Sequence, residues 1–317
     1  MTLTQLEAFV LVARLGSVKS AAAVLGVSEP AVSNALAALR VHLGDPLVSR
    51  TSTGMELTPG GQRLVGIASQ MVNLAADAEA AIRRAQGAPE LLRIVASSTV
   101  AEFVAPPLVD AFTARTPAVE ASIGVSNAGE MTALLLDRLA DVAFGPRLPG
   151  LDSVPMMRHR LVVVAGKRHQ FAGTTAEVPL AALADNDWLL DPSGAEAVSD
   201  VRRMLVELRV PERRIRVFPS ASAVWAAVAE GYGVAPAIAH LVSREVDDGR
   251  LVVLPVRGTP VDRYWYVSTL EAGRRSPAAT KLRSFLSTPD AMYVMHRADG
   301  SVPVAHFRPP VYVTIWS

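Results

Sequence analysis

The stretch SVKSAAAVLGVSEPAVSN, residues 17–34, decides the fold of the N-terminal part of the chain. Ser17 is placed to cap one short helix, and Gly26 ends that helix because glycine readily adopts the left-handed conformation. Ser28 then caps a second helix, which tolerates Pro30 in its first turn. The first helix of the pair needs a small inner face, and the sequence supplies Ala21, Ala22 and Leu25.

Two helices joined by a short turn that contains a glycine form a helix-turn-helix. Alanines let the first helix pack closely on the second, while small polar residues near the start of the second helix remain available to a partner. A small three-helix bundle without a partner is the alternative interpretation. The sequence predicts that DNA is contacted by Lys19, Ser28, Glu29, Ala31, Ser33, Asn34, Arg50 and Thr51.

The residues on either side of this pair complete a small domain over residues 1–60. Thr4-Gln5-Leu6-Glu7 has the pattern of a capping box and predicts the start of a first helix. Residues 46–58 predict a two-stranded wing that turns around Thr53-Gly54. The wing carries Arg50 and Thr51, which places both residues on a separate DNA-contacting element.

A long helix is predicted next, capped by Thr58, opened by Pro59 and ending near Gln86. Apolar residues alternate along it at spacings of three and four, which is the pattern of a helix that packs against another. The seam either packs on its own domain or pairs with a second copy, and dimerisation is favoured because the neighbouring domains look complete without it. The predicted dimerisation residues are Leu64, Ile67, Met71, Leu74 and Ala78.

From residue 92 the pattern changes to alternating strands and helices after a hinge at residues 87–91. We expect a strand over 92–96, a single helix from about Val100 to Arg115, and further β-α units, and this order predicts parallel sheets. The expected domains are a first lobe (92–165 plus 265–288), a second lobe (166–264) and a C-terminal extension (289–317). In that extension Ala298-Asp299-Gly300 indicates a hairpin that adds a strand to a lobe or to a neighbouring subunit.

Serine and threonine residues follow several predicted strands directly, where helices begin. Ligands in such folds bind beyond the carboxyl ends of strands, and helix N-termini favour anions. Each of these residues can also be a plain helix cap, and Arg147 can be an ordinary solvated arginine. The sequence predicts a small anionic organic effector held by Ser97, Ser98, Thr99, Ser126, Asn127, Arg147, Ser220 and Ser222.

Composition excludes several classes of protein. The chain has 317 residues and a net charge of +1. It has no cysteine, so disulfides and thiolate metal sites are excluded. Neither a signal peptide nor a membrane span is predicted, which favours the cytoplasm. No hydrolase, zinc-protease or P-loop motif occurs, and the six histidines lack metal-ligand spacing. We therefore expect no catalytic residues, no metal and no cofactor.

The stretch from Leu3 to Gly61 resembles the winged helix-turn-helix of bacterial LysR-type transcriptional regulators. The resemblance rests on an ordered set of residues that includes Phe9, Ser17, Ala21-Ala22, Pro30, Leu43-Gly44 and Leu57-Thr58. It covers about residues 2–288 and implies a multidomain protein. An all-α winged helix-turn-helix and a long linker helix precede a two-lobed α/β effector domain with Rossmann-like lobes, similar to periplasmic binding proteins. The implied partners are promoter DNA, a small effector and further copies of the chain, often as a dimer of dimers.

The DNA-binding region departs from the family in its charge. Residues 1–60 contain four basic and four acidic side chains, a net charge of zero, which is weak for a protein that binds phosphates. Glu29 stands where the family usually has glutamine, and it either accepts from cytosine or caps its helix. Other functions remain open at this point. The chain can be a two-lobed ligand-binding protein or an enzyme, neither of which regulates through DNA, or it can be an architectural DNA protein.

Overall fold

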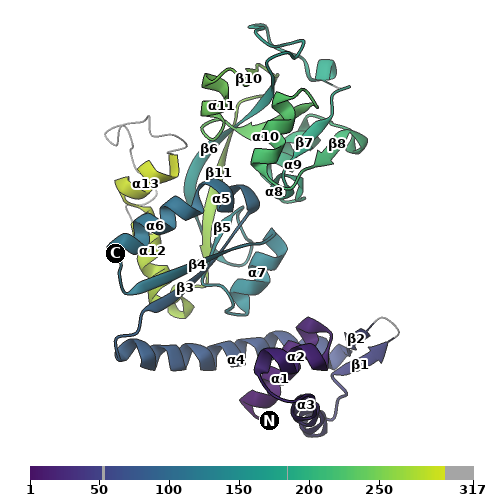
Figure 1. The fold of residues 1–317 in the computed structure, drawn as a ribbon, viewed down its shortest axis with the longest axis vertical. Coiled ribbons are helices and arrows are strands. Elements are labelled where there is room, and N and C mark those ends of the chain that lie inside the picture. Colours follow the sequence, from purple (N-terminus) through teal and green to yellow (C-terminus); the bar gives the residue numbers. More distant parts are fainter. Residues whose placement is uncertain (52–53, 184, 297–317) are drawn as a thin grey trace. The chain divides into compact units, whose positions relative to one another are not determined.

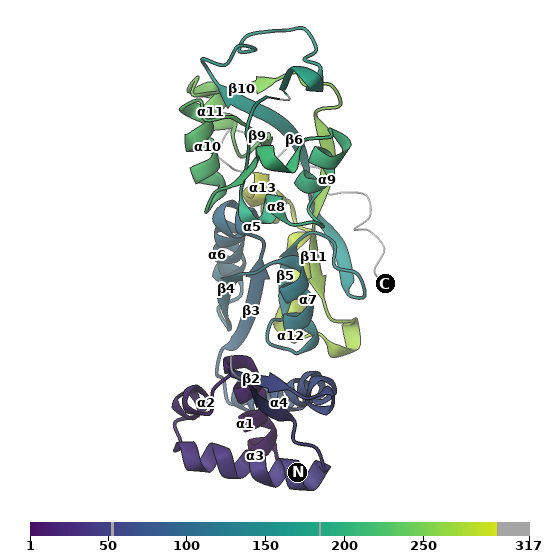
Figure 2. The ribbon, with the colours of Figure 1, turned by 90° about the vertical axis from the view of Figure 1, so that its right-hand side faces the viewer.

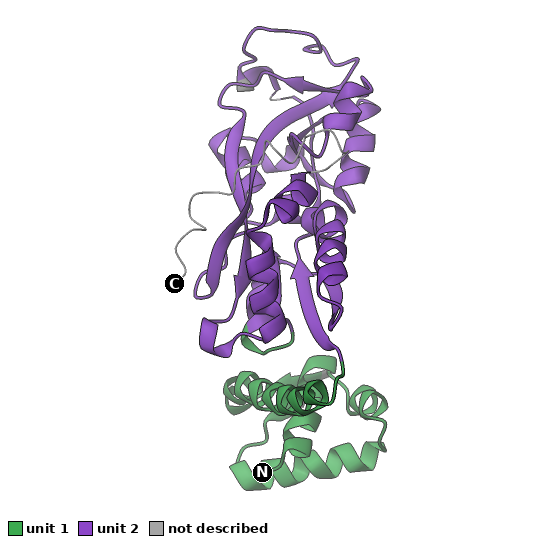
Figure 3. Cartoon of the chain, turned by 90° about the vertical axis from the view of Figure 1, so that its left-hand side faces the viewer, with its two compact units in different colours: residues 1–88, 136–139 green, residues 89–135, 140–317 purple. Residues whose placement is uncertain are grey.

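The computed structural model describes residues 1–51, 54–183 and 185–296 of the chain. Among these residues two compact units are found, residues 1–88 with 136–139 and residues 89–135 with 140–296, drawn in different colours in Figure 3. Each unit has its own hydrophobic core, so each is described by itself.

The first unit contains four helices and a two-stranded sheet among its described residues: α1 (Leu3–Leu15), α2 (Val18–Leu25), α3 (Glu29–Leu43), β1 (Val48–Thr51), β2 (Gly54–Leu57) and α4 (Pro59–Ala85) (Figure 1). Ser17, Ser28 and Thr58 cap α2, α3 and α4 as predicted. The capping box of α1 lies elsewhere: Thr2 and Gln5 form it, two residues before the predicted Thr4 and Glu7. Both pairs have the required spacing, and the earlier one is used because the helix begins at Leu3.

The core of this unit lies between α1, α2 and α3. Phe9, Ala21 and Leu39 are completely buried. The two alanines of α2 (Ala21 and Ala22) lie in this core, as the sequence predicts. The long helix α4 closes the core with Ala68, while Leu64 packs partly against it.

The second unit is a mixed sheet covered by helices (Figures 1 and 2). Its strands are β3 (Glu90–Ala96), β4 (Val119–Val125), β5 (Val142–Gly145), β6 (Asp152–Gly166), β7 (Trp188–Leu190), β8 (Ile215–Val217), β9 (Val234–Ile238), β10 (Leu251–Leu254) and β11 (Val261–Thr269). Its α-helices are α5 (Ser98–Phe103), α6 (Ala105–Arg115), α7 (Ala128–Leu136), α8 (Pro192–Ala195), α9 (Asp200–Glu207), α10 (Ala221–Ala229), α11 (Ser243–Asp247), α12 (Pro277–Leu286) and α13 (Pro289–His296). The strand order is β4-β3-β5-β11-β6-β9-β7-β8, and β10 pairs with β6.

Two long antiparallel strands, β6 and β11, join the two ends of this sheet. The parallel strands β4, β3 and β5 lie on the side of β11, and the parallel strands β9, β7 and β8 lie on the side of β6. We call the β3–β5 part lobe 1 and the β7–β9 part lobe 2. The β-α-β order of each lobe agrees with the prediction of parallel strands, whereas the length of β6 and β11 was not predicted.

Three predicted elements of this unit are wrong in detail. The helix expected from Val100 to Arg115 is broken at Val104, because Pro106 and Pro107 have no N–H group and begin a new helix. Residues 195–208, for which the same alternation of strands and helices predicts one helix, are helical only from Asp200 to Glu207 after the end of α8 at Ala195, because Ser199 caps α9. Residues 291–296, expected to be the first extended run of the tail hairpin, lie in the helix α13, and the proposed turn at Ala298-Asp299-Gly300 lies outside the described residues.

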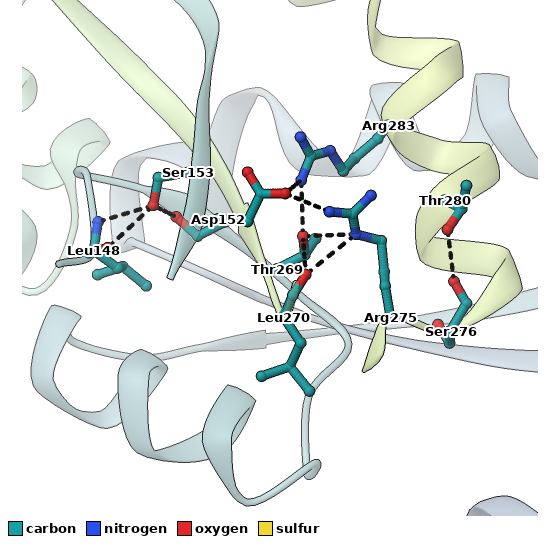
Figure 4. A network of polar contacts seen from close by, with 10 residues as sticks. Leu148, Asp152, Ser153, Thr269, Leu270, Arg275, Ser276, Thr280 and Arg283 are labelled. Atoms are coloured by element: carbon teal, nitrogen blue, oxygen red, sulfur yellow. Dashed lines mark hydrogen bonds and ion pairs between the residues drawn. The ribbon is translucent and has the colours of Figure 1, made fainter. Parts of the chain in front are cut away.

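A partly buried polar network fixes the ends of β6 and β11 to α12 (Figure 4). The carboxylate of Asp152 accepts from Arg275 at 2.5 Å and from Arg283 at 2.8 Å, and both arginines also donate to Thr269. Burial and the charge of Arg283 lower the pKa of Arg275. The network therefore explains how two strands that belong to both lobes begin and end at fixed positions in lobe 1. No single helix of the described chain is long and apolar enough to span a membrane.

Candidate functional site

The exposed face of α3 is the candidate nucleic-acid interface. Val32, Leu36 and Leu39 anchor the helix in the core, and this orientation leaves the opposite face in solvent. The residues predicted to contact DNA on α2, α3 and the cap of α3 are all exposed, namely Lys19, Ser28, Glu29, Ala31, Ser33 and Asn34. Within the described chain the side chains of Ser33 and Asn34 have no hydrogen-bond partner, so their donors and acceptors are available.

The start of α3 answers one question that the sequence left open. Ser28 caps the helix, since its hydroxyl accepts from the Ala31 N–H at 3.4 Å. Glu29 is the first helical residue and does not cap it, so the capping interpretation of Glu29 is wrong. Its carboxylate is exposed next to the positive end of the helix and is available to a base.

The wing consists of β1 and β2, paired antiparallel with Arg50 opposite Met55 and Thr51 opposite Gly54. Arg50 and Thr51 lie on β1 as predicted, while their side chains and the turn residue Thr53 lie outside the described part. Asp45 connects the two ends of the wing, because its carboxylate accepts from the Leu47 N–H before β1 at 2.6 Å and from the Thr58 hydroxyl after β2 at 2.7 Å. These bonds lower the pKa of Asp45.

The predicted seam of α4 is largely uncovered. Ile67, Met71 and Leu74 are 58%, 40% and 55% exposed, and Ala78 is also exposed. Leu64 differs, because it packs partly against the core of its own unit. Contiguous apolar residues on one face of a long helix are costly to leave in water, so this face is a candidate dimer contact.

A cavity of about 60 Å³ lies within the second unit, between the two lobes. Its wall combines residues that follow β3 and β5, residues of β6 and β11, and the segment from the end of β7 to α9. The polar lining residues are Ser97, Thr99, His159, Asp191, Ser193, Glu196, Ser199 and Asp200, and the apolar ones include Pro146, Leu161, Val201, Ile238 and Trp265.

Asp191 organises one side of this cavity. It follows β7 and caps α8 by accepting from the N–H groups of Ser193 and Gly194. Across the cleft, the hydroxyls of Ser98 and Thr99 donate to the same carboxylate at 2.6 and 2.9 Å. Ser98 and Thr99 were predicted to hold an anionic effector, and in this structure the Asp191 carboxylate accepts a hydrogen bond from each of their hydroxyls.

Two further carboxylates cross between the lobes and cap helices of the opposite lobe. Glu102 of α5 accepts from the N–H groups of Ala221 and Ser222 at the start of α10, at 3.1 and 3.3 Å. Glu196 of lobe 2 accepts from the Ala128 N–H at the start of α7, at 3.0 Å. Positive helix ends that a ligand carboxylate would use are therefore occupied by the chain itself.

Burial and charge shift the acidity of the groups in the cavity wall. Burial, with the charges of Asp191 and Glu130, raises the pKa of Glu196, and burial also raises the pKa of Asp200. Burial lowers the pKa of His159 to about 3, helped by the charges of His240 and Arg263. The imidazole of His159 is therefore neutral near pH 7.

The predicted effector residues divide into two groups. Ser97 and Thr99 line the cavity, and Ser98 supports it through Asp191. The other five do not line it: Ser126 and Asn127 bond to Glu130, Arg147 is exposed, Ser220 caps α10, and the N–H of Ser222 bonds to Glu102.

Sequence reasoning missed Asp191, Glu196, His159 and Trp265 in the cavity wall. Asp191 was within reach, because it directly follows the buried strand β7 and so obeys the strand-end rule that selected Ser97. Nothing in the sequence distinguished His159 from the other histidines, because only the crossing of β6 and β11 brings it to the cavity.

Comparison with known proteins covers both units. Residues 3–62 match the family described as "Bacterial regulatory helix-turn-helix protein, lysR family", and residues 85–288 match the "LysR substrate binding domain". An uncharacterized HTH-type transcriptional regulator of Mycobacterium tuberculosis is 36% identical, over 100% of both chains. The HTH-type transcriptional regulator CfxR of Cupriavidus necator is 29% identical over 96% of each chain.

Solved structures support the same fold. Full-length CbnR complexed with its target DNA has a TM-score of 0.61 at 24% identity, covering 90% of this chain and 99% of that one. At this identity the similarity concerns the fold alone.

Proposed function

Because the chain belongs to the LysR family and is therefore a DNA-binding transcriptional regulator rather than an enzyme, we propose that α3 and the wing read promoter DNA. We further propose that the cavity between the lobes holds the small organic effector that changes this binding. The observation that carries the proposal is that the side chains on α3 and those around the cavity differ in their contacts. Within the described residues, the side chains of Ser33 and Asn34 on the exposed face of α3 have no hydrogen-bond partner, whereas residues from both lobes enclose the cavity.

Each proposed DNA contact has a chemical role. Asn34 offers a donor and an acceptor to adenine, Glu29 accepts from a cytosine amino group, and the methyl of Ala31 packs on thymine. Lys19 and Arg50 contact phosphates, with Arg50 placed by the wing. Base contacts carry the discrimination between sequences, and with zero net charge over residues 1–60 the phosphate contacts add little affinity.

The assembly that we propose is a dimer formed through the exposed face of α4, and two such dimers in a tetramer. Burying Ile67, Met71 and Leu74 between two copies removes them from water and holds two DNA-reading heads at a fixed spacing. The protein would act in the cytoplasm, where promoter DNA is found.

The effector would act by favouring one arrangement of the lobes. An effector shifts an equilibrium only by its differential affinity for the two states, and about 1–3 kcal/mol is typical of such coupling. Asp191, Glu102 and Glu196 each join the lobes by hydrogen bonds, so a molecule entering the cavity competes with or reinforces contacts that already set the distance between lobes.

The test compares two substitutions on α9. Val201→Phe fills the cavity, and Val206→Phe adds the same ring to a side chain that is 65% exposed. A metabolite that stabilises the purified protein serves as effector. We expect Val201→Phe to bind promoter DNA normally yet to keep the same footprint with and without effector, while Val206→Phe responds like wild type. A Val201→Phe protein whose footprint still shifts would place the effector elsewhere.

A further inference from the structure

The cavity wall contains polar atoms that form no hydrogen bond within the described residues. They include an acceptor oxygen of Glu196 and the Ser97 hydroxyl, which can accept or donate. Glu196 uses Oε2 for the Ala128 N–H, and its Oε1 accepts no bond from the described residues. Ser97 starts α5 and is buried in the cavity wall, and its hydroxyl makes no capping bond. A ligand that satisfies both residues must bring hydrogen-bond donors.

His159 is a third unused group in the same wall. Its side chain is 3% exposed, and its Nδ1 is buried with no hydrogen-bond partner in the described chain. The ring lies against Trp265, with centroids 4.6 Å apart. Because the imidazole is neutral, one of its ring nitrogens accepts a hydrogen bond and the other donates one. A buried polar group without a partner is costly unless something supplies one.

The charge of the wall is also unbalanced. Asp200 is paired with Arg203 at 3.1 Å and with Arg263 at 3.4 Å. Asp191 and Glu196 form no ion pair with any described lysine or arginine, and the charges of Asp191 and Glu130 oppose ionisation of Glu196. Asp191 is surrounded by donors from Ser98, Thr99, Ser193 and Gly194, so it contributes negative potential rather than a free oxygen.

These features argue against the anionic effector predicted from the sequence. The starts of α7, α8 and α10 already hold Glu196, Asp191 and Glu102. A ligand carboxylate in the cavity would meet three carboxylates, of which only Asp200 is ion-paired within the described residues, with no lysine or arginine in the wall.

We propose that the effector carries a small organic cation with N–H donors, an ammonium, amidinium or guanidinium group. The cation donates to Glu196 Oε1, to the Ser97 hydroxyl and to the His159 imidazole, and it packs beside Trp265, whose ring favours positive charge. This inference rests on the proposed function, that the cavity is the effector site. The cavity of about 60 Å³ has room for about four waters, and so for a group of similar size.

Three probes of equal size and different charge test the proposal: acetamidinium, acetamide and acetate. Binding to the full-length protein is followed by the ¹⁹F resonance of 5-fluorotryptophan at position 265, which is assigned with Trp265→Phe, at constant ionic strength. We expect acetamidinium to shift this resonance saturably, with an affinity at least about tenfold above that of acetamide. Acetate should not shift it.

Two isosteric substitutions separate charge from structure. Glu196→Gln keeps an oxygen for the Ala128 N–H and removes the charge, so acetamidinium should bind at least about tenfold more weakly and acetamide should be unaffected. Glu102→Gln is the matched control, since Glu102 also joins the lobes but does not line the cavity, and acetamidinium affinity should stay within about twofold of wild type.

Acetate binding that equals or exceeds acetamidinium binding would overturn the proposal. It would also be overturned if about 100 mM acetamidinium leaves the Trp265 resonance unmoved, since four-atom ligands reach millimolar affinity in a matched site. The proposed function is judged by the promoter footprint instead. Cation binding at Trp265 without any footprint change for larger cations would reject the regulatory role and keep the ligand class.

Discussion

The starts of helices in the two units carry the same kinds of side chain and use them in opposite ways. On α3, Ser28 caps the helix, and the next uncharged polar residues, Ser33 and Asn34, are exposed without a partner in the described chain. On α5, Ser98 and Thr99 have similar chemistry, yet both donate to Asp191 across the cleft. A DNA-reading surface leaves its polar side chains available to DNA. In this cleft most polar side chains form hydrogen bonds with one another, and only a few acceptors remain for a ligand.

The same contrast holds for apolar groups. The first unit leaves a row of apolar side chains of α4 in water, while the second buries a large core between two lobes. The exposed polar and apolar side chains of the first unit suit contacts with macromolecules, as proposed above. The hydrogen bonds between the two lobes of the second unit suit a small ligand that changes the distance between the lobes.

The largest effect is expected at the free apolar face. Changing Ile67 and Met71 together to Glu places like charges across the proposed dimer contact, so the dimer should dissociate and promoter affinity should fall by about 100-fold or more. Analytical ultracentrifugation and DNA-binding titrations measure both. Arg83→Ala, an exposed change further along α4, should affect neither. A double variant that still sediments as a dimer would assign dimerisation to the second unit.

Removing the contacts within the cleft should destabilise the second unit. Ser98→Ala with Thr99→Val takes two hydrogen bonds from the Asp191 carboxylate, which costs about 2–4 kcal/mol of unfolding free energy. All four tryptophans lie beyond residue 88, so urea unfolding followed by tryptophan fluorescence reports this unit. DNA affinity without effector should stay near wild type. Unchanged urea stability would mean that Asp191 finds other donors.

Acid should destabilise the second unit through its buried histidines. Burial lowers the pKa of His240 to about 4 and that of His159 to about 3, both below the unfolded value near 6.5. The unfolded chain therefore binds more protons below pH 6.5, and stability falls as the pH drops toward 4. Each histidine should cost about 2 kcal/mol between pH 7 and pH 5. The raised pKa values of Glu196 and Asp200 act in the opposite direction.

His240→Asn tests this account by the change between the two pH values rather than by absolute stability. The variant should lose about 2 kcal/mol less than wild type when the pH is lowered from 7 to 5. Equal losses in urea titrations of both proteins would show that His240 is charged in the folded state.

At the free polar face of α3 the expected effect is smaller and depends on sequence. Asn34→Ala should weaken binding to the promoter by about tenfold and leave binding to random DNA unchanged, because a base contact is lost and phosphate contacts remain. Fluorescence anisotropy with both DNAs measures the ratio. Equal weakening on both DNAs would make Asn34 a phosphate contact.

The smallest expected effect is at the wing. Arg50→Ala should weaken binding to promoter and random DNA alike and reduce the slope of log affinity against log salt by about 0.9. Titrations between low and moderate salt give this slope. A slope equal to that of wild type would remove Arg50 from the phosphate contacts.

The helices of the first unit could be predicted from the sequence because their determinants are local. Ser17 and Ser28 cap neighbouring residues, Gly26 sets one turn, and the spacing of Leu36 and Leu39 fixes the buried face. The one error, the capping box of α1, moved the start by two residues because Thr2 and Thr4 satisfy the same local pattern.

The cavity could be predicted only in part. Ser97 and Thr99 were found because they follow a strand, and Asp191 follows β7 by the same rule. The charge of the ligand was predicted from hydroxyls and helix ends alone, which favour anions when nothing else is near.

The sequence by itself determined the helix-turn-helix, the long helix with its apolar seam and the alternation of strands and helices, because caps, turns and periodicity act over a few residues. Only the tertiary structure decided the chemistry of the cleft. Asp191 meets Ser98 across 93 positions of the chain, and Glu102 meets Ala221 across 119. A hydrogen bond depends on distances of about 3 Å that no local pattern specifies, so the partner that occupies each polar group is known only once the lobes are folded together.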